Sequence, residues 1–156
     1  LLVHRDVLKS IAPDLTKKLL EKNTELRVDN DYLKASGESL KSAQDSDWST
    51  EYLDNILSIK TVESVDEAIK HIDQYGTNHS ECIVSEDEST CMKFLNSVDA
   101  SCILINASTR FNDGGQLGLG AELGISTTKI HAYGPMGAEQ MTTTRFVVIG
   151  DGHIRS

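Results

Sequence analysis

The stretch "SVDEAIKHIDQYGTNHSECIVSEDESTCMKFLNSVDASCILIN", residues 64–106, decides the fold of this chain of 156 residues. Val65, Ile69 and Ile72 share one face of a predicted helix over residues 65–76, and a second helix is predicted over residues 89–98. Short apolar runs at residues 81–85 and 101–106 read as strands, as does the run at residues 53–62 before them. This strand–helix–strand–helix–strand order predicts an α/β domain with a mostly parallel sheet.

Local signals place the ends of these elements. Ser64 with Glu67, and Ser85 with Glu88, are spaced as capping boxes at the starts of the two helices, and Gly76 ends the first. Earlier in the chain we expect a strand at residues 1–4, a helix at 11–23 with Pro13 in its first turn, and a strand at 25–28. Residues 29–50 read as a polar surface excursion with one helical turn, in which Trp48 and the charge cluster of Asp45 and Asp47 form a solvated loop and an anchor. A last strand is predicted at residues 145–150, followed by a turn at Asp151-Gly152.

Composition and charge exclude several classes of protein. The formal net charge of −9 argues against nucleic acid and anionic membrane surfaces as partners, because both attract clustered Lys and Arg. No apolar run is long enough to span a membrane. The three cysteines, Cys82, Cys91 and Cys102, show no C-x-x-C spacing, and we expect them to be reduced in an intracellular, cytoplasmic setting.

The segment "RFNDGGQLGLGAELG", residues 110–124, is unusually rich in glycine. It is not a self-contained nucleotide site, because Gly118 and Gly120 fit G-x-G-x-x-G but the next glycine, Gly124, comes one place late. No Walker loop is present. The histidines show no zinc-protease or paired His/Cys spacing, so no metal is expected.

The loop that leaves the strand at 101–106 is the first candidate site. Asn106, Ser108, Thr109 and Arg110 form a dense set of donors, and a guanidinium grips a carboxylate or phosphate with two parallel hydrogen bonds. The alternative is that these residues only shape an ordered loop, with Asn106 bonding backbone groups. His79 and Ser80 carry a similar pair of interpretations: they hold a phosphate or carboxylate, or they form a buried turn bonded to backbone.

Two long blocks resemble a known family. "VESVDEAIKHIDQYGTNHSECIVSED" (residues 62–87) and "NASTRFNDGGQLGLGAELGISTTKIHAYGPMG" (residues 106–137) are similar to the γ-glutamyl phosphate reductases, or glutamate-5-semialdehyde dehydrogenases, of the aldehyde dehydrogenase superfamily. The resemblance implies a three-layer αβα sandwich of the aldehyde dehydrogenase catalytic-domain type with a C-terminal arm strand. Residues 1–131 then form the catalytic, substrate-binding lobe, and residues 132–156 form the arm.

The resemblance also implies a reaction, the NADPH-dependent reduction of L-glutamate 5-phosphate to glutamate 5-semialdehyde and phosphate in proline biosynthesis. The nucleophilic cysteine of the family precedes the block matching Leu1, and the main cofactor domain precedes that. We therefore expect this chain alone to fold but to be inactive. Glu51 matches a glutamate that holds the nicotinamide ribose, although the usual E-x-F-G-P context reads E-Y-L-D-N here. Residues 118–122 resemble a G-x-G-R-E turn, with Ala121 in place of arginine.

Partners follow from the same resemblance. They are the small-molecule substrate L-glutamate 5-phosphate, the N-terminal cofactor domain, and a second copy of the chain joined through the C-terminal strand. A second copy is expected because residues 142–150 have no evident strand within the lobe to pair with. Two alternatives stay open: a non-catalytic assembly or regulatory module, and the reductase lobe of a bifunctional pyrroline-5-carboxylate synthase.

Overall fold

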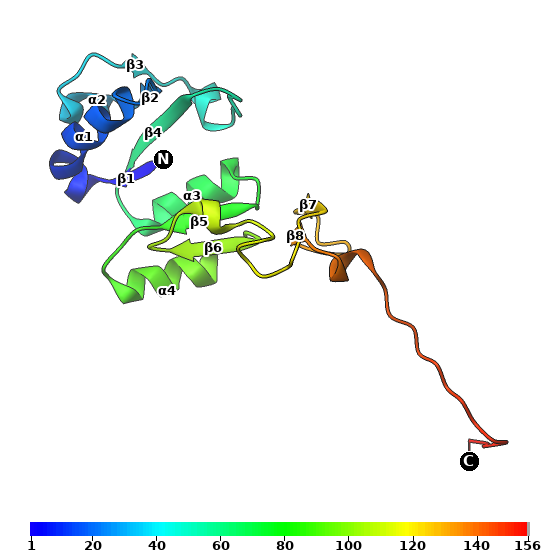
Figure 1. The fold of residues 1–156 in the computed structure, drawn as a ribbon. Coiled ribbons are helices and arrows are strands. Elements are labelled where there is room, and N and C mark those ends of the chain that lie inside the picture. Colours follow the sequence, from blue (N-terminus) through cyan, green and yellow to red (C-terminus); the bar gives the residue numbers. More distant parts are fainter. Residues whose placement is uncertain (156) are drawn as a thin grey trace.

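Strands and helices alternate along most of the chain in the computed structural model, which describes residues 1–155 (Figure 1). The strand predicted at residues 25–28 and the helix predicted at 65–76 are found with those bounds to within one residue. The elements are β1 (Leu2–His4), α1 (Arg5–Leu20), β2 (Glu25–Val28), α2 (Asn30–Ser36), β3 (Lys41–Ser42), β4 (Ile56–Val62), α3 (Val65–Tyr75), β5 (Ser80–Ile83), α4 (Glu88–Ser97), β6 (Cys102–Ile105), β7 (Gly124–Ser126) and β8 (Gly134–Met136), with short 3₁₀ helices η1 (Asp45–Trp48), η2 (Thr109–Phe111) and η3 (Glu139–Met141).

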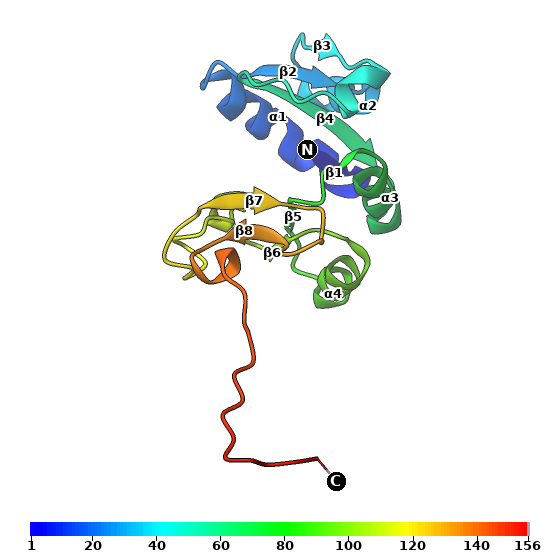
Figure 2. The same ribbon diagram turned by 90° about the vertical axis from the view of Figure 1, so that its right-hand side faces the viewer.

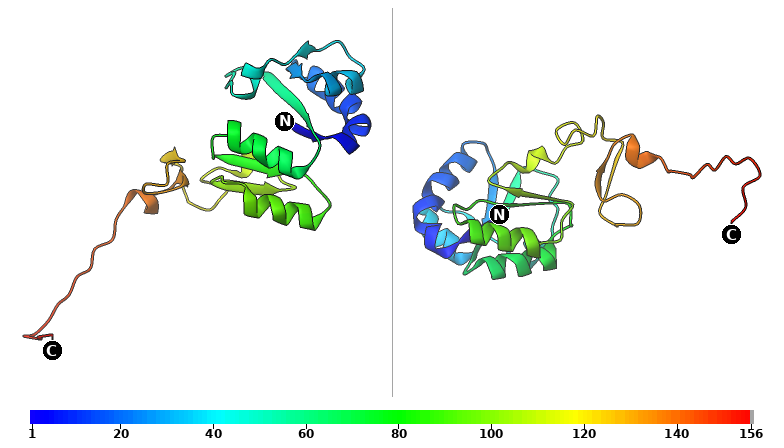
Figure 3. Two further views of the ribbon diagram at one scale, coloured as in Figure 1. Left: turned by 180° about the vertical axis from the view of Figure 1, so that it is seen from behind. Right: turned by 90° about the horizontal axis from the view of Figure 1, so that it is seen from below.

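The strands form two parallel sheets and one hairpin. The larger sheet has the order β1-β4-β2-β3, and β5 pairs with β6 in a second sheet. Because β1 and β2 occupy the two edges of β4, β5 has no edge of β4 to join. Helices α3 and α4 lie together on one face of β5–β6, while α1 and α2 cover the larger sheet (Figures 2 and 3). The α/β class with parallel strands flanked by helices is confirmed.

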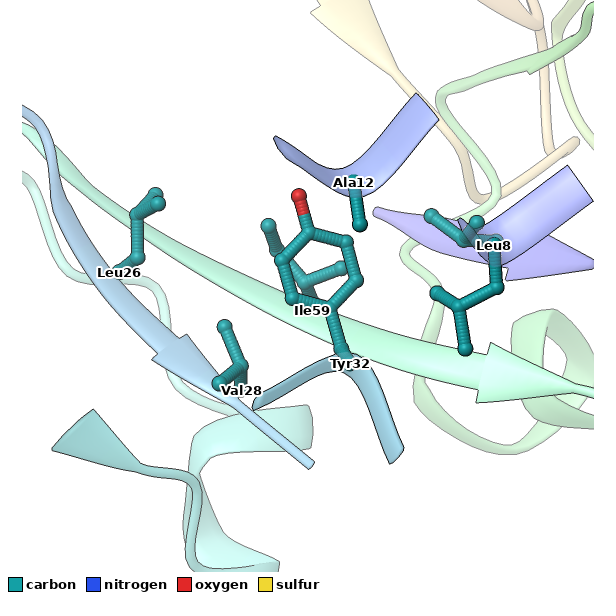
Figure 4. Packing of buried hydrophobic residues seen from close by; sticks show 7 residues of the cluster. Leu8, Ala12, Leu26, Val28, Tyr32 and Ile59 are labelled. Atoms are coloured by element: carbon teal, nitrogen blue, oxygen red, sulfur yellow. The ribbon is translucent and has the colours of Figure 1, made fainter. Parts of the chain in front are cut away.

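The main core lies between α1, α2 and the larger sheet (Figure 4). Tyr32 of α2 is fully buried, and its hydroxyl lies 3.1 Å from Thr16 Oγ1 of α1. The prediction that residues 29–50 are a surface excursion is therefore wrong. Asp29 caps α2 by accepting from Tyr32 N, and this places the tyrosine beneath the helix. The buried cluster is Val3, Leu8, Ala12, Leu26, Val28, Tyr32 and Ile59.

Two predicted helix starts need correction. Helix α1 begins at Arg5 and not at residue 11, so Pro13 lies inside the helix and not in its first turn. The helix runs through the proline because Leu8 and Ala12, on its inner face, are buried against the sheet. The prediction that Ser85 begins a capping box is also wrong. Asp87 caps α4, and its side chain accepts a hydrogen bond from Thr90 N at 2.9 Å. For α3, Ser64 caps as predicted.

An ionic cluster holds the segment before β4. Asp47 is 5% exposed, and its carboxylate accepts hydrogen bonds of 2.7 Å from Gln44 N, from the Tyr52 hydroxyl and from Arg27 Nη1. The Arg27 guanidinium also lies over the Tyr52 ring. These bonds, that from Gln44 first, lower the pKa of Asp47 to about 2. Asp47 is thus an anchor of the fold and not a solvated charge.

The glycine-rich segment folds back on itself at a close approach. A Cβ on Gly114 would collide with the carbonyl oxygen of Ala121 and lie 2.9 Å from Glu122 Cβ, so only glycine fits there. Gly118 and Gly120 have φ of 78° and 75°, in the left-handed region that favours glycine. The glycines therefore serve a tight fold of the loop.

The C-terminal segment beyond η3 extends away from the rest of the chain (Figures 1 and 2). The structure gives no strand at residues 145–150, and Phe146, Val147, Val148 and Ile149 are exposed. The expected division after residue 131 falls in the connection between β7 and β8. Pairing of this segment with another chain stays a prediction. None of the described helices is long and apolar enough to cross a bilayer.

Replacing Asp47 by asparagine should lower the free energy of unfolding by about 2–3 kcal/mol at neutral pH, because three bonds to a buried carboxylate are weakened. The folded pKa of about 2 lies below the ordinary value near 4, so the carboxylate stabilises the fold above pH ~4. That contribution should disappear between about pH 4 and pH 2. Urea unfolding across this range measures it. Asp45→Asn, at the exposed neighbour, is the control. If Asp45→Asn lowered the free energy of unfolding as much as Asp47→Asn, the anchor role would be contradicted.

Gly114→Ala should destabilise the protein by about 1–3 kcal/mol, because the added methyl group forces Ala121 and Glu122 apart. Gly115→Ala is the matched control, since its Cβ would meet only the flexible Asp113 carboxylate at 3.1 Å. Thermal unfolding and the rate of limited proteolysis within residues 110–124 measure the difference. Equal behaviour of the two variants would remove the close approach as the reason for the glycine.

Candidate functional site

The candidate residues of β5, β6 and the following loop lie at both ends of the smaller sheet. Ser80 is in register with Cys102 at the amino end, and Ile83 with Ile105 at the carboxyl end. His79 and Ser80 are therefore at the amino end, whereas Asn106 follows the last residue of β6. The structure brings the two groups together only through the loop that runs between them.

Asn106 fixes the start of this loop, at the carboxyl end of the smaller sheet. Its φ is 53°, and its side chain makes two bonds of 2.9 Å with Ser85: Oδ1 accepts from the backbone N–H and Nδ2 donates to the carbonyl oxygen. Both polar atoms of the side chain are thus occupied by backbone. Asn106 performs the loop-shaping role that the sequence offered as the alternative to substrate binding.

The middle of the loop presents the free donors. Ser108 caps η2, with its hydroxyl accepting from Arg110 N at 3.3 Å. Ser108, Thr109 and Arg110 are all exposed. Within residues 1–155 the Arg110 guanidinium has neither an ion-pair nor a hydrogen-bond partner, so its fork of donors is free for an anion.

Asn112, which sequence reasoning missed, fixes the far end of the loop, at the amino end of the smaller sheet. Its Nδ2 donates to Ser80 Oγ at 2.8 Å, and Ser80 Oγ lies 2.8 Å from His79 Nδ1. His79 Nε2 and Asn112 Oδ1 are buried without a hydrogen-bond partner in the described part of the chain. No local signal marks Asn112, because its partner lies 32 residues earlier.

The hairpin β7–β8 docks at the same amino end. Tyr133 donates to the carbonyl oxygen of Asn78 at 3.2 Å and to Asp99 at 3.1 Å, and Lys129 forms an ion pair of 2.6 Å with Asp99. Ser101 Oγ donates to the His79 carbonyl oxygen at 2.6 Å. Beside this contact lies an open cavity of about 410 Å³, whose lining includes Ser101, Leu119, His131, Tyr133 and Gln140.

Glu51 lies apart from these residues, in the connection between η1 and β4. Its side chain is exposed and, among the described residues, has no hydrogen-bond or ion-pair partner. The next residue, Tyr52, is bound to the buried Asp47. A free carboxylate on an anchored turn suits the two hydroxyls of a ribose, because an ionised carboxylate only accepts hydrogen bonds.

The cysteines and His71 lie in environments that favour packing. Cys91 is buried, Cys82 Sγ donates to the Ala107 carbonyl oxygen at 3.1 Å, and burial raises the pKa of the Cys102 thiol. Burial of this kind disfavours a thiolate at Cys102. His71 lies between the rings of Trp48 and Tyr75, and burial, followed by the nearby Lys60 charge, lowers its pKa. In residues 1–155 no three His, Cys, Asp or Glu side chains gather as a metal site.

Known proteins similar to this chain include several γ-glutamyl phosphate reductases. The γ-glutamyl phosphate reductases of Listeria innocua and Dictyoglomus turgidum are 52% and 50% identical to it over 100% and 99% of its length. The chain spans 37% of the length of each of these relatives.

Solved structures extend the comparison. A crystal structure of the γ-glutamyl phosphate reductase of Thermotoga maritima matches 99% of the chain, with a TM-score of 0.92 and 45% identity, and the match covers 37% of that protein. An acetylating aldehyde dehydrogenase of Geobacillus thermoglucosidasius shares the fold, with a TM-score of 0.68 and 15% identity over 99% of the chain and 43% of its own. A profile of the aldehyde dehydrogenase family matches residues 40–147. The chain therefore belongs to the aldehyde dehydrogenase family.

Proposed function

We propose that this chain is the substrate-binding part of the catalytic lobe of an NADPH-dependent reductase that converts L-glutamate 5-phosphate to glutamate 5-semialdehyde and phosphate. The observation that carries the proposal is identity of about half to γ-glutamyl phosphate reductases along the whole chain. Because the chain spans 37% of those relatives, the activity belongs to the whole protein. A cytoplasmic location, expected from the sequence, fits this role and stays a prediction.

The reaction replaces the phosphate of an acyl phosphate by hydrogen. The bond from the acyl carbon to the phosphate oxygen breaks, inorganic phosphate leaves, and the carbonyl carbon gains a hydride, which NADPH supplies when bound. We expect the nucleophilic cysteine upstream of Leu1, outside this chain, with most of the cofactor site. Glu51, exposed and unpaired among the described residues, is the residue of this chain that fits the cofactor, through the hydroxyls of its ribose.

Arg110 is the substrate ligand best supported by its surroundings. The substrate carries a phosphate at one end and an α-carboxylate at the other, so its site needs a fixed cation. Between the two ends of the loop Arg110 is the one cationic side chain, and the hydroxyls of Ser108 and Thr109 flank it. His79 and Ser80, at the amino end of β5, and Asn106, after β6, contribute to the substrate site by holding the two ends of the loop.

In the intact enzyme, Arg110→Lys should lower kcat/KM by roughly 2–4 kcal/mol of transition-state binding, because an ammonium cannot reproduce the two parallel bonds of a guanidinium. Thermal stability should change little, since the Arg110 side chain is exposed. The measurements are kcat/KM for glutamate 5-semialdehyde in the reverse direction and a melting curve.

Arg5→Lys is the matched control for this substitution. Arg5 pairs with Asp31 and Glu63 on the surface of the larger sheet, so its replacement should leave kcat/KM unchanged. Near-normal kinetics of Arg110→Lys, or a fall in melting temperature that accounts for the lost activity, would return Arg110 to a structural role.

The exposed C-terminal segment supports assembly through a second copy of the chain. Phe146 and Val148 are 101% and 92% exposed in an extended stretch of β-branched residues, and an unpaired strand of this composition is normally covered by another chain. We place the subunit contact of the proposed enzyme here.

Replacing Phe146 and Val148 together by serine should raise the dissociation constant of the oligomer by at least about tenfold, because two apolar side chains leave the contact. Sedimentation velocity over a range of concentrations measures it. Ile154→Ser, which alters an exposed apolar residue beyond the predicted strand, is the control. An oligomer equally stable in the double variant would place the contact elsewhere.

A further inference from the structure

Asn112 joins the neighbouring residues His79 and Ser80 in a hydrogen-bonded series at the amino end of β5. Asn112 Nδ2 lies 2.8 Å from Ser80 Oγ, which lies 2.8 Å from His79 Nδ1. Asn112 Nδ2 is also 3.5 Å from the His79 carbonyl oxygen, and this contact favours the orientation in which the amide nitrogen faces β5. The nitrogen faces the strand because an amide oxygen there would meet another acceptor.

The position of one proton depends on the Ser80 hydroxyl, because a hydroxyl oxygen can accept two hydrogen bonds and donate one. An amide nitrogen only donates, so Ser80 Oγ accepts from Asn112. In the relay proposed below, the Ser80 hydroxyl directs its own hydrogen to His79 Nδ1 and does not accept a hydrogen bond from it. Because Nδ1 accepts that bond, the neutral imidazole carries its proton on Nε2.

The two ends of the series are buried without partners. Of the three such side-chain atoms in the described residues, two are His79 Nε2 and Asn112 Oδ1. Buried polar atoms without a partner are rare, and exceptions to this rule gather at functional sites. Since Nε2 is buried, the His79 ring acts through Ser80 and Asn112 and not by direct contact with a ligand in solvent.

We propose that Asn112, Ser80 and His79 form a positioning relay for the loop that carries Arg110. Asn106 fixes one end of the loop to Ser85, and the relay fixes the other end to β5, so that the exposed Arg110 is held between two amide anchors. Residues 106 and 112 are six positions apart, a span short enough for both anchors to limit where the guanidinium lies. The proposal rests on the proposed function, because its effect reaches the substrate through Arg110.

The position of the proton tests the relay directly. Histidine labelled with ¹⁵N in the ring, in the full-length enzyme at about pH 8.5, where a free imidazole is neutral, should give the Nε2–H pattern for His79. His79→Gln identifies the signal by its loss. Ser80→Ala should convert the pattern to a mixture of tautomers, and Ser80→Thr, which keeps the hydroxyl, should preserve it. An Nδ1–H pattern or a mixture in the unmodified enzyme would overturn the relay.

Steady-state kinetics test its positioning role. Ser80→Ala and Asn112→Ala should each raise KM for glutamate 5-semialdehyde about tenfold, with kcat within about twofold and KM for NADP⁺ unchanged, because only the placement of Arg110 is loosened. Ser80→Thr, which keeps the hydroxyl, should leave KM close to that of the unmodified enzyme. Ser10→Ala, which removes an exposed hydroxyl on α1 that bonds only to backbone, is the control and should change neither constant.

The two measurements separate the failures. A fixed tautomer that Ser80→Ala abolishes, with KM unchanged, would contradict the positioning role while leaving the proposed function intact. Absence of reductase activity in the unmodified enzyme would remove the proposed function, and the tautomer pattern then decides the relay by itself.

Discussion

Strand β4 has both of its edges occupied, by β1 on one side and β2 on the other, and the placement of everything after it depends on this pairing. The chain leaves β4 through α3 and cannot return to the same strand. The next two strands, β5 and β6, pair with each other in a second sheet, which α3 and α4 cover on one face (Figure 2). The loop that leaves β6, the hairpin and the C-terminal segment are all attached to this smaller sheet.

The candidate site inherits its geometry from the short length of that sheet. Because β5 and β6 have only four residues each, the loop after β6 reaches from the carboxyl end to the amino end in a few residues. Asparagine side chains hold it at both ends, each against the backbone or a hydroxyl of the β5 segment. Between the anchors, the Arg110 guanidinium has no partner among the described residues and is free for a ligand.

A second constraint acts on the larger sheet. The buried carboxylate of Asp47 gathers Arg27 from β2, Gln44, and Tyr52 from the connection to β4, so one charge orders a segment with little apolar content of its own. A buried charge of this kind is stable only when it is paired and fully bonded, which is the case here. Glu51 emerges from the same turn, so the position of the proposed cofactor ligand depends on an interaction within the fold.

The sequence by itself determined the elements whose causes are local. Helical spacing of Val65, Ile69 and Ile72, with Ser64 as cap, was enough to place α3, and the alternation at residues 25–28 was enough to place β2. The order of strands and helices indicated the α/β class, and the polar residues after the strand at 101–106 indicated the loop that carries Arg110. Only the tertiary structure decided the rest: the burial of Tyr32 against Thr16, the pairing of β4 that divides the strands between two sheets, and the bond from Asn112 to Ser80. These contacts join residues between 16 and 58 positions apart. Local propensity does not specify them, because their energy depends on a neighbour that only the folded chain brings near.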